Sequence, residues 1–330
     1  MKSNMSVGII GVGTVAQIHI NALKKAGQRI VALCDLDTTR CIEASDKFSL
    51  NAKIYSDYIE MLDCERLDVI HICTPHYLHA NMICEGLKRD VNVLCEKPLA
   101  INEKQLVQIE KSVNISNAQL GVCFQNRFNA SVLYVKDYLK DKEILSASAN
   151  LIWDRGINYY AQGKWRGTWS QEGGGVMINQ AIHGLDVLQW LCGMPEYVTA
   201  YTANVSLKNV IEVEDTAFGL FKMKNGGKFV VNATNAASFC FPVYYMFRAS
   251  GHTVELTADN IIIDGKFITK SDGLPIFGKE IWGVGHISLI KNFYKCLENG
   301  EKFSIGFDEG KNAVKLVLAM YRSNGQEIKI

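Results

Sequence analysis

The first third of the chain alternates between short apolar runs and longer stretches with helical periodicity. After residue 13, for example, Val15, Ile18, Ala22 and Leu23 recur at the spacing of one helix face. Apolar runs separated by helices indicate a parallel sheet that is covered on both faces. The pattern predicts strands at 5–10, 30–34, 67–73, 91–95 and 119–124, and helices at 14–26, 38–48, 78–88 and 103–115.

The pattern changes after about residue 125, where longer runs alternate between apolar and polar positions. The segment "KNGGK" at 224–228 is typical of a hairpin turn, and consecutive strands with short turns indicate an antiparallel sheet. We therefore expect an α/β protein with a doubly wound domain at 1–124 and a second domain at 125–330. The alternating runs predict strands at 146–153, 197–206, 216–223, 227–234 and 243–250, with helices near 130–140, 180–192, 284–298 and 308–323.

The composition is that of a packed globular protein. Of the 330 residues, 48% are hydrophobic and 21% are charged, and the formal net charge is +1. This balance favours neither nucleic acid nor an anionic membrane as the main partner. No apolar run approaches the length of a membrane span, and the first apolar stretch is predicted to be a strand rather than a signal peptide.

The ten cysteines form no C-x-x-C pair, and several lie in apolar runs, as Cys73 and Cys95 do. This usage predicts buried free thiols in a protein of the reducing cytoplasm. The seven histidines show neither H-E-x-x-H nor a Cys/His zinc spacing, so we expect no metal site.

The segment "VGIIGVGTVA" contains a G-x-G-x-x-A motif formed by Gly11, Gly13 and Ala16. It follows a predicted strand and opens a predicted helix, which is the context of a dinucleotide-binding loop. Gly11 permits a tight turn, and Gly13 lets the backbone approach a pyrophosphate at the start of the helix, beside Thr14 and Val15. A glycine turn that binds no nucleotide is the alternative.

Asp35 ends the second predicted strand, about 20 residues after Gly13, where a carboxylate binds the ribose hydroxyls of NAD. The same carboxylate repels the 2′-phosphate of NADP, so NAD is favoured. Thr38, Thr39 and Arg40 follow closely and could hold a phosphate, which leaves NADP open.

Two further strands end in polar residues. The first leads into Thr74, Pro75, His76 and His79, which could line the dinucleotide; alternatively, Pro75 only starts a helix and the histidines are solvated. The second leads into "CEKPLA".

In this second segment Pro98 biases Lys97 away from helix, and the fixed geometry suits an ammonium that meets a substrate hydroxyl. An ordinary surface ion pair of Glu96 and Lys97 is the alternative.

The predicted helix at 178–192 has a polar stripe on an otherwise apolar surface. At about 100° per residue, Asn179, His183, Asp186 and Trp190 fall within a sector of about 60°. Asp186 could hold one nitrogen of His183 and fix its tautomer. The alternative is a solvent-facing stripe with an incidental histidine.

Taken together, the glycine motif, Asp35, "TPHYLH", "CEKPLA", "FQNRFN" and "INQAIHGLDVLQWL" resemble the glucose–fructose oxidoreductase/inositol dehydrogenase (Gfo/Idh/MocA) family over nearly the whole chain. The resemblance implies a Rossmann domain, followed by an α/β domain whose large open, mainly antiparallel sheet commonly forms the oligomer interface. It also implies a nicotinamide cofactor, a sugar, cyclitol or polyol substrate, and a homodimer or homotetramer.

By the same resemblance, Lys97 matches the lysine beside the nicotinamide and the reacting hydroxyl, and Glu96 matches the neighbour that contacts the nicotinamide ribose. His183 matches the catalytic histidine. The residues that match the dinucleotide-contacting loop are Thr74, Pro75, His76 and His79.

The resemblance also marks departures and weaker matches. Asn179 stands where inositol-dehydrogenase-like members have Asp, so it can bind a substrate hydroxyl but cannot ionise. "KWRGTW" resembles a subgroup in which some members act on nucleotide sugars, which places Trp165 and Arg166 in the substrate pocket. Arg127 of "QNRF" is placed there as well.

The expected reaction is the reversible oxidation of a secondary alcohol to a ketone with hydride transfer to nicotinamide. His183 is the candidate base and Lys97 stabilises the oxyanion, although the two roles could be reversed. Two alternatives remain: a glycosidase that recycles its NAD, and a non-catalytic NAD-binding regulator.

Overall fold

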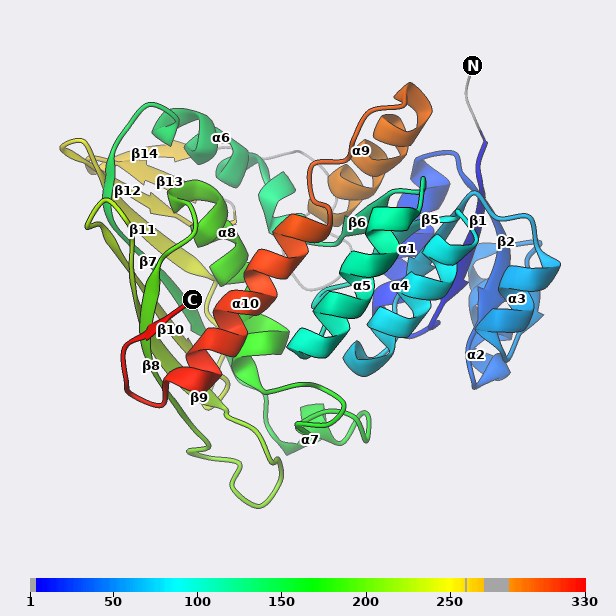
Figure 1. Ribbon diagram of the computed structural model, residues 1–330, viewed down its shortest axis with the longest axis horizontal. Coiled ribbons are helices and arrows are strands. Elements are labelled where there is room, and N and C mark those ends of the chain that lie inside the picture. Colours follow the sequence, from blue (N-terminus) through cyan, green and yellow to red (C-terminus); the bar gives the residue numbers. More distant parts are fainter. Residues whose placement is uncertain (1–3, 259, 270–284) are drawn as a thin grey trace. The chain divides into compact units, whose positions relative to one another are not determined.

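The computed structural model describes residues 4–258, 260–269 and 285–330, and the chain forms two compact units (Figure 1). The first unit comprises Met1–Gln125 and His286–Lys311, and the second comprises Asn126–Gly285 and Asn312–Ile330. The expected division into 1–124 and 125–330 differs from this one mainly in the segment His286–Lys311. A boundary placed by a change of pattern misses a segment that returns to an earlier domain.

The first unit contains a six-stranded parallel sheet in the order β3-β2-β1-β4-β5-β6. Its central strands β1 and β4 are buried throughout because helices cover both faces of such a sheet. The order is that of a Rossmann fold, in which ligands bind at the carboxyl ends of the strands. The strands are β1 (Ser6–Ile10), β2 (Arg29–Cys34), β3 (Lys53–Tyr55), β4 (Val69–Ile72), β5 (Asn92–Cys95) and β6 (Leu120–Val122).

The helices between these strands begin at capping residues. Asp37, Asp57 and Asn102 each accept a hydrogen bond from a backbone N–H of the first turn of the helix that follows. The helices are α1 (Thr14–Lys25), α2 (Thr38–Phe48), α3 (Tyr58–Cys64), the 3₁₀ turn η1 (His76–Leu78), α4 (His79–Lys88), α5 (Glu103–Ile115) and, after the return of the chain, α9 (Gly285–Asn299).

The second unit contains a nine-stranded mixed sheet in the order β14-β13-β12-β11-β7-β10-β9-β8-β15. All of its pairings are antiparallel except that of β7 with β10. The strands are β7 (Ile144–Ile152), β8 (Tyr197–Ala203), β9 (Thr216–Lys222), β10 (Lys228–Thr234), β11 (Tyr244–Ala249), β12 (His252–Leu256), β13 (Asn260–Ile263), β14 (Lys266–Thr269) and β15 (Ile328–Lys329).

Burial alternates along β9, β10 and β11, so this sheet has one packed face and one exposed face. Helix α8 packs on β7 and β10. The remaining helical segments are η2 (Gln125–Phe128), α6 (Ala130–Leu139), α7 (Ile157–Tyr160), the π-helical turn η3 (Met177–Ala181), α8 (Ile182–Cys192) and α10 (Phe307–Ser323).

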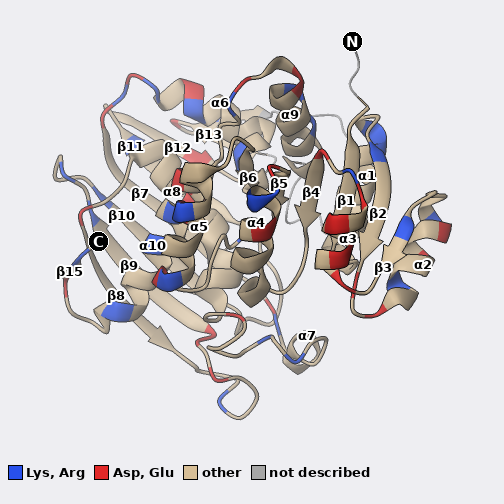
Figure 2. Cartoon of the chain, turned by 45° about the vertical axis from the view of Figure 1, so that its right-hand side comes forward, with Lys and Arg blue, Asp and Glu red and all other residues tan. Residues whose placement is uncertain are grey.

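The expected α/β fold class, a Rossmann sheet followed by a large and mainly antiparallel sheet, is confirmed. The sequence pattern did not predict the short elements β3, α3, β15 and β12–β14, which are too short for a clear period. Acidic and basic residues are interspersed along the helices (Figure 2). Within the described ranges, no helix is long and apolar enough to cross a membrane.

Candidate functional site

The glycine loop joins β1 to α1 and has the geometry that a dinucleotide requires. Gly11 has φ +83°, and a Cβ there would lie 2.8 Å from the carbonyl carbon and oxygen of Cys73, so only glycine fits. A Cβ on Gly13 would meet no atom within 4 Å, which leaves open space at the first turn of α1. A pyrophosphate fits there, at the end of the helix that carries the positive partial charge, beside Thr14 and Val15.

Asp35 follows β2 and is fixed against this loop. Its Oδ2 accepts a hydrogen bond from the Val12 N–H at 2.8 Å, and its Oδ1 accepts one from the Asp37 N–H at 3.0 Å. These bonds fix the carboxylate beside the glycine loop, as the binding of a ribose diol requires. Arg40 pairs with Asp37 at 3.3 Å on the surface.

The loop after β4 is held by a histidine. His76 and His79 are both buried, which excludes the interpretation that they are solvated. The ring nitrogens of His79 lie 2.7 Å from the Pro98 carbonyl oxygen and 2.9 Å from that of Thr74. Burial lowers the pKa of His79. His79 thus joins the Thr74–Pro75 loop to the loop of the E-K-P motif, and a direct contact of either histidine with a dinucleotide stays a prediction.

Glu96 and Lys97 follow β5, next to β4 in the sheet, and Glu96 does not lie on the surface as the alternative of a surface ion pair requires. The Glu96 carboxylate is buried and Lys97 is half-buried. Glu96 Oε1 lies 3.0 Å from His19 Nε2 and 3.4 Å from His286 Nε2, and its Oε2 accepts a hydrogen bond from the Lys97 N–H at 3.3 Å. Burial works to raise the pKa of Glu96, but the bonds from His19 and His286 outweigh it and hold this pKa well below its ordinary value.

The sequence interpretation missed the histidines around Glu96. His19 lies on α1, His71 lies inside the apolar strand β4, and His286 comes from the returning segment at the start of α9. A histidine within an all-apolar strand needs a buried hydrogen-bond partner, and this signal could have drawn attention to His71. His286 had no such signal, because its segment was assigned to the second domain.

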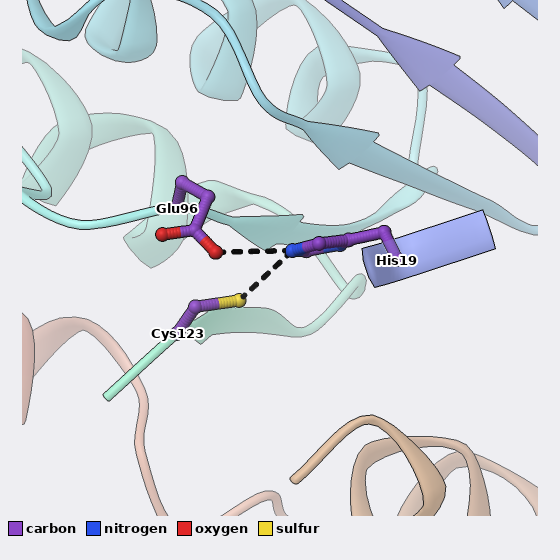
Figure 3. Close-up of side chains that lie close together, drawn as sticks. All are labelled: His19, Glu96 and Cys123. Carbon is purple, nitrogen blue, oxygen red and sulfur yellow. Dashed lines mark hydrogen bonds and ion pairs between the residues drawn. The ribbon is translucent and has the colours of Figure 1, made fainter. Parts of the chain in front are cut away.

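Figure 3 shows His19, Glu96 and Cys123 with their side-chain polar atoms close together. The Cys123 sulfur lies 4.0 Å from the same His19 Nε2 that faces Glu96. A nucleophilic triad needs the thiol and the carboxylate on different ring nitrogens, so this arrangement is not one. Burial, and then the charge of Glu96, raise the pKa of the Cys123 thiol well above its ordinary value, which keeps the thiol protonated.

In the second unit, the predicted helix at 178–192 begins with the π-helical turn η3 instead of a regular α-helix. The rotation of 100° per residue of a regular α-helix therefore does not give the position of Asn179 in the stripe. Turns of π-helix are frequent at functional sites. The stripe does not face solvent, because Asp186 is 0% exposed and Asn179 is buried. His183 is half-buried on α8.

The carboxylate of Asp186 accepts two hydrogen bonds from one guanidinium group. Arg127 Nε and Nη2 lie 2.8 and 2.6 Å from the two Asp186 oxygens, and both side chains are buried. The guanidinium also lies over the Trp190 ring. Arg127 therefore fixes α8 to the segment that precedes α6. Its contact with substrate, and the contact of Asp186 with His183, stay predictions.

Two of the predicted pocket residues, Arg166 and Asn179, donate to the Tyr159 hydroxyl, and the third, Trp165, lies against the Arg166 guanidinium. Arg166 donates to this oxygen and lies between the rings of Tyr159 and Trp165, while Asn179 Nδ2 donates to it at 3.2 Å. Asn179 Nδ2 also donates to the buried carboxylate of Glu172. Tyr159 and Glu172 were not predicted, since a tyrosine and a glutamate in a loop carry no specific sequence signal.

The same loop lines an open pocket of about 580 Å³. Its cationic side chains come from Lys164, Arg166 and Lys208, and Glu212 is its one carboxylate among the residues that the structure describes there. The excess of positive charge suits an anionic ligand.

Comparison with known proteins agrees with this architecture. Residues 5–124 match a family model described as an oxidoreductase family with an NAD-binding Rossmann fold, and residues 142–253 match the GFO/IDH/MocA C-terminal domain. The chain is 23% identical over 335 residues to myo-inositol 2-dehydrogenase of Thermotoga maritima, covering 97% of this chain and 96% of that one. It is 24% identical to D-glucoside 3-dehydrogenase of Escherichia coli, covering 92% and 98%.

Among solved structures, the WlbA dehydrogenase of Bordetella pertussis in complex with NADH and UDP-GlcNAcA is 26% identical, with a TM-score of 0.86 and 99% coverage of both chains. Levoglucosan dehydrogenase with NADH and levoglucosan shares the fold at 21% identity, with a TM-score of 0.89 and 99% coverage of both chains. The resemblance seen in the sequence is thus confirmed: the chain belongs to the Gfo/Idh/MocA oxidoreductase family, with an NAD-binding Rossmann domain and the C-terminal domain typical of that family.

Proposed function

We propose that this protein is an NAD-dependent oxidoreductase that interconverts a secondary alcohol and a ketone on a sugar, cyclitol or sugar derivative. The observation that carries the proposal is the edge of the first sheet, where the glycine loop follows β1 and the Glu96–Lys97 pair follows β5. The carboxyl ends of parallel strands share one edge, so a lysine stands at the edge where a dinucleotide binds. The dehydrogenase relatives named above support the substrate class.

Bound NAD supplies the hydride acceptor, and the chain supplies the proton chemistry. When the alcohol loses hydride from its carbon, its hydroxyl proton has to leave as well. In the proposal His183 takes this proton, and the ammonium of Lys97 stabilises the oxygen as it becomes negative. The reverse assignment of the two roles gives the same overall balance, which is alcohol plus NAD giving ketone, NADH and a proton.

We further propose that the substrate is an anionic sugar derivative. The pocket of the second unit carries Lys164, Arg166 and Lys208, and guanidinium and ammonium groups bind carboxylates and phosphates. The WlbA structure, at 26% identity, is a complex with NADH and UDP-GlcNAcA. Nucleotide sugars with a uronate therefore come first in the substrate panel, followed by neutral polyols and aldoses.

The test measures NADH formation with each compound of this panel in the wild type and in Lys97→Met, His183→Asn and the control Lys104→Met, which removes an exposed lysine from α5. We expect both site variants to retain NADH binding and to lose about 10²–10⁴ in kcat, while the control stays at the wild-type rate. Normal turnover in Lys97→Met would refute the assignment. Release of a sugar without net formation of NADH would instead indicate the glycosidase. Binding of NADH by the wild type without turnover of any compound would indicate the non-catalytic regulator.

The open face of the second sheet supports assembly with a second copy of the chain. Tyr201 pairs with Phe218, and Leu220 pairs with Val230, so these outward side chains form one apolar patch that also includes the exposed Met246 of β11. Tyr201 is 63% exposed and Phe218 is 53% exposed, which is unusual for adjacent large apolar side chains. We expect light scattering to show a dimer or tetramer that Val230→Lys reduces to a smaller species; a wild-type monomer would refute this.

A further inference from the structure

Four titratable side chains lie in a row through the core of the first unit. The Tyr294 hydroxyl is 2.9 Å from His71 Nε2, His71 Nδ1 is 2.7 Å from His19 Nδ1, and His19 Nε2 is 3.0 Å from Glu96 Oε1. All four residues are buried. A buried polar row of this length is costly unless every member is hydrogen-bonded, and here each member meets the next.

The direction of the last bond follows from the chemistry of Glu96. A carboxylate only accepts hydrogen bonds, so His19 Nε2 carries a proton and donates it. The two facing Nδ1 atoms of His19 and His71 share one proton between them, since two N–H groups cannot point at each other. His71 therefore hydrogen-bonds to the second ring nitrogen of His19, and the Tyr294 hydroxyl hydrogen-bonds to the second ring nitrogen of His71. The His19 ring is held at both of its nitrogens.

Glu96 transmits this constraint to the E-K-P motif. Its Oε1 is held by His19 and His286, which leaves Oε2 to accept the bond from the Lys97 N–H at 3.3 Å. Glu96 and Lys97 are adjacent in the chain, so the orientation of the carboxylate fixes the backbone from which the Lys97 side chain extends. We propose that His19, held by His71 and Tyr294, is a positioning residue that fixes the orientation of the Glu96 carboxylate and thereby sets the place of Lys97 for hydride transfer.

This inference rests on the proposed function for its activity readout, but not for its structural content. The groups that face Glu96 from the surrounding elements are the side chains of Cys73, His79, Cys95, Lys97, Cys123 and His286, besides those of the row. Burial raises the pKa of the three thiols, which stay uncharged. Of these groups, His19, His286 and the weak thiol donor of Cys123 hydrogen-bond to the carboxylate.

The alternative use of the cluster is a metal site. His19, Glu96 and Cys123 offer an imidazole, a carboxylate and a thiol whose ligand atoms all lie within 4.8 Å of one another, which is a donor set that zinc accepts. In that case zinc would replace the proton that His19 donates to Glu96, and Cys123 would be a thiolate. The two uses exclude each other, so metal analysis of the purified protein belongs in the test.

The activity test compares the pH dependence of kcat/KM in the wild type, His19→Leu and His19→Gln. Leucine removes the donor, so Glu96 becomes easier to protonate, and we expect the acidic limb of the profile to move to higher pH. Glutamine offers an amide N–H at a similar reach and should restore the wild-type profile. A uniform loss of kcat in both variants with no shift of the limb would show a merely structural role and overturn the proposal.

A second measurement needs neither turnover nor a variant that folds. In ¹⁵N-histidine spectra of the wild type, we expect the His19 ring to carry a proton on Nε2, with Nδ1 as the acceptor of the bond from His71. A His19 ring that carries its proton on Nδ1 only, or stoichiometric zinc in the purified protein, would overturn the proposal. If Lys97→Met turns over normally while the spectra agree with expectation, the proposed function has failed and the His19–Glu96 arrangement stands.

Discussion

The carboxylate of Glu214 holds the start of the helix that carries His183. It accepts hydrogen bonds from the backbone N–H groups of Gly175 at 2.9 Å and Met177 at 3.0 Å, and the Tyr321 hydroxyl donates to it at 2.9 Å. Three donors on one buried carboxyl group fix the backbone at the point where the π-helical turn begins. The Gly173–Gly175 run serves this approach, since a Cβ on Gly175 would collide with the Glu214 carbonyl oxygen.

Glu214 should make stability depend on pH. Burial, only partly offset by its hydrogen bonds, raises the pKa of Glu214 from 4.5 to about 7. Between these two values the unfolded chain is ionised at this position while the folded chain still holds the proton. Stability from this group is therefore fully present below about pH 4.5 and is lost as the pH rises through about 7, by up to about 3 kcal/mol.

The measurement is urea unfolding at a series of pH values in the wild type and in Glu214→Gln, which cannot ionise. We expect the free energy of unfolding of the variant to fall less steeply between about pH 4.5 and 7 than that of the wild type. Glu143→Gln, which removes an exposed carboxylate, serves as the control and should leave the wild-type slope unchanged. Parallel curves for the wild type and Glu214→Gln would contradict the prediction.

The two glycines of the first loop should fail in different ways when they are replaced by alanine. Gly11→Ala forces a side chain into a left-handed backbone and against the Cys73 carbonyl at 2.8 Å, so it should destabilise the folded protein by about 1–3 kcal/mol. Gly13→Ala meets no protein atom within 4 Å, so it should fold normally and weaken NAD binding, because its Cβ enters the space proposed for the pyrophosphate.

Thermal unfolding together with an NADH titration by fluorescence distinguishes the two cases. The expected pattern is a lower Tm for Gly11→Ala only, and weaker binding at an unchanged Tm for Gly13→Ala. If Gly13→Ala binds NADH as the wild type does, the open space at the start of α1 is not where the pyrophosphate lies.

The sequence predicted what depends on periodicity and on local motifs. Five of the six strands of the first sheet, the glycine loop and the position of Asp35 follow from apolar runs and from a turn that only glycine can form. These features are local in the sequence, because each is set by residues that are close together along the chain.

What the sequence did not predict depends on contacts between distant segments. His286 and Tyr294 belong to the first unit although they lie near the end of the chain, and Tyr294 bonds to His71, 223 residues earlier. Glu214 likewise bonds to the helix start at Gly175. The π-helical turn Met177–Ala181 lies at this tertiary contact, and no propensity scale distinguishes it from regular helix. Pairing of polar groups across such distances leaves no period in the sequence.

The last prediction concerns the choice between NAD and NADP, which the carboxylate of Asp35 should determine. Asp35→Asn keeps an acceptor for the Val12 N–H and removes the charge that repels a 2′-phosphate. It also weakens the bonds to the ribose hydroxyls, because hydrogen bonds to a charged group contribute about 1.5–3 kcal/mol. We expect kcat/KM with NAD to fall about 10–100-fold and the ratio of NADP to NAD efficiency to rise.

Asp37→Ser is the matched control: serine still caps α2, and the exposed Arg40 loses its partner at 3.3 Å. If the control raises the NADP ratio as much as Asp35→Asn does, then Arg40 and not Asp35 decides the cofactor.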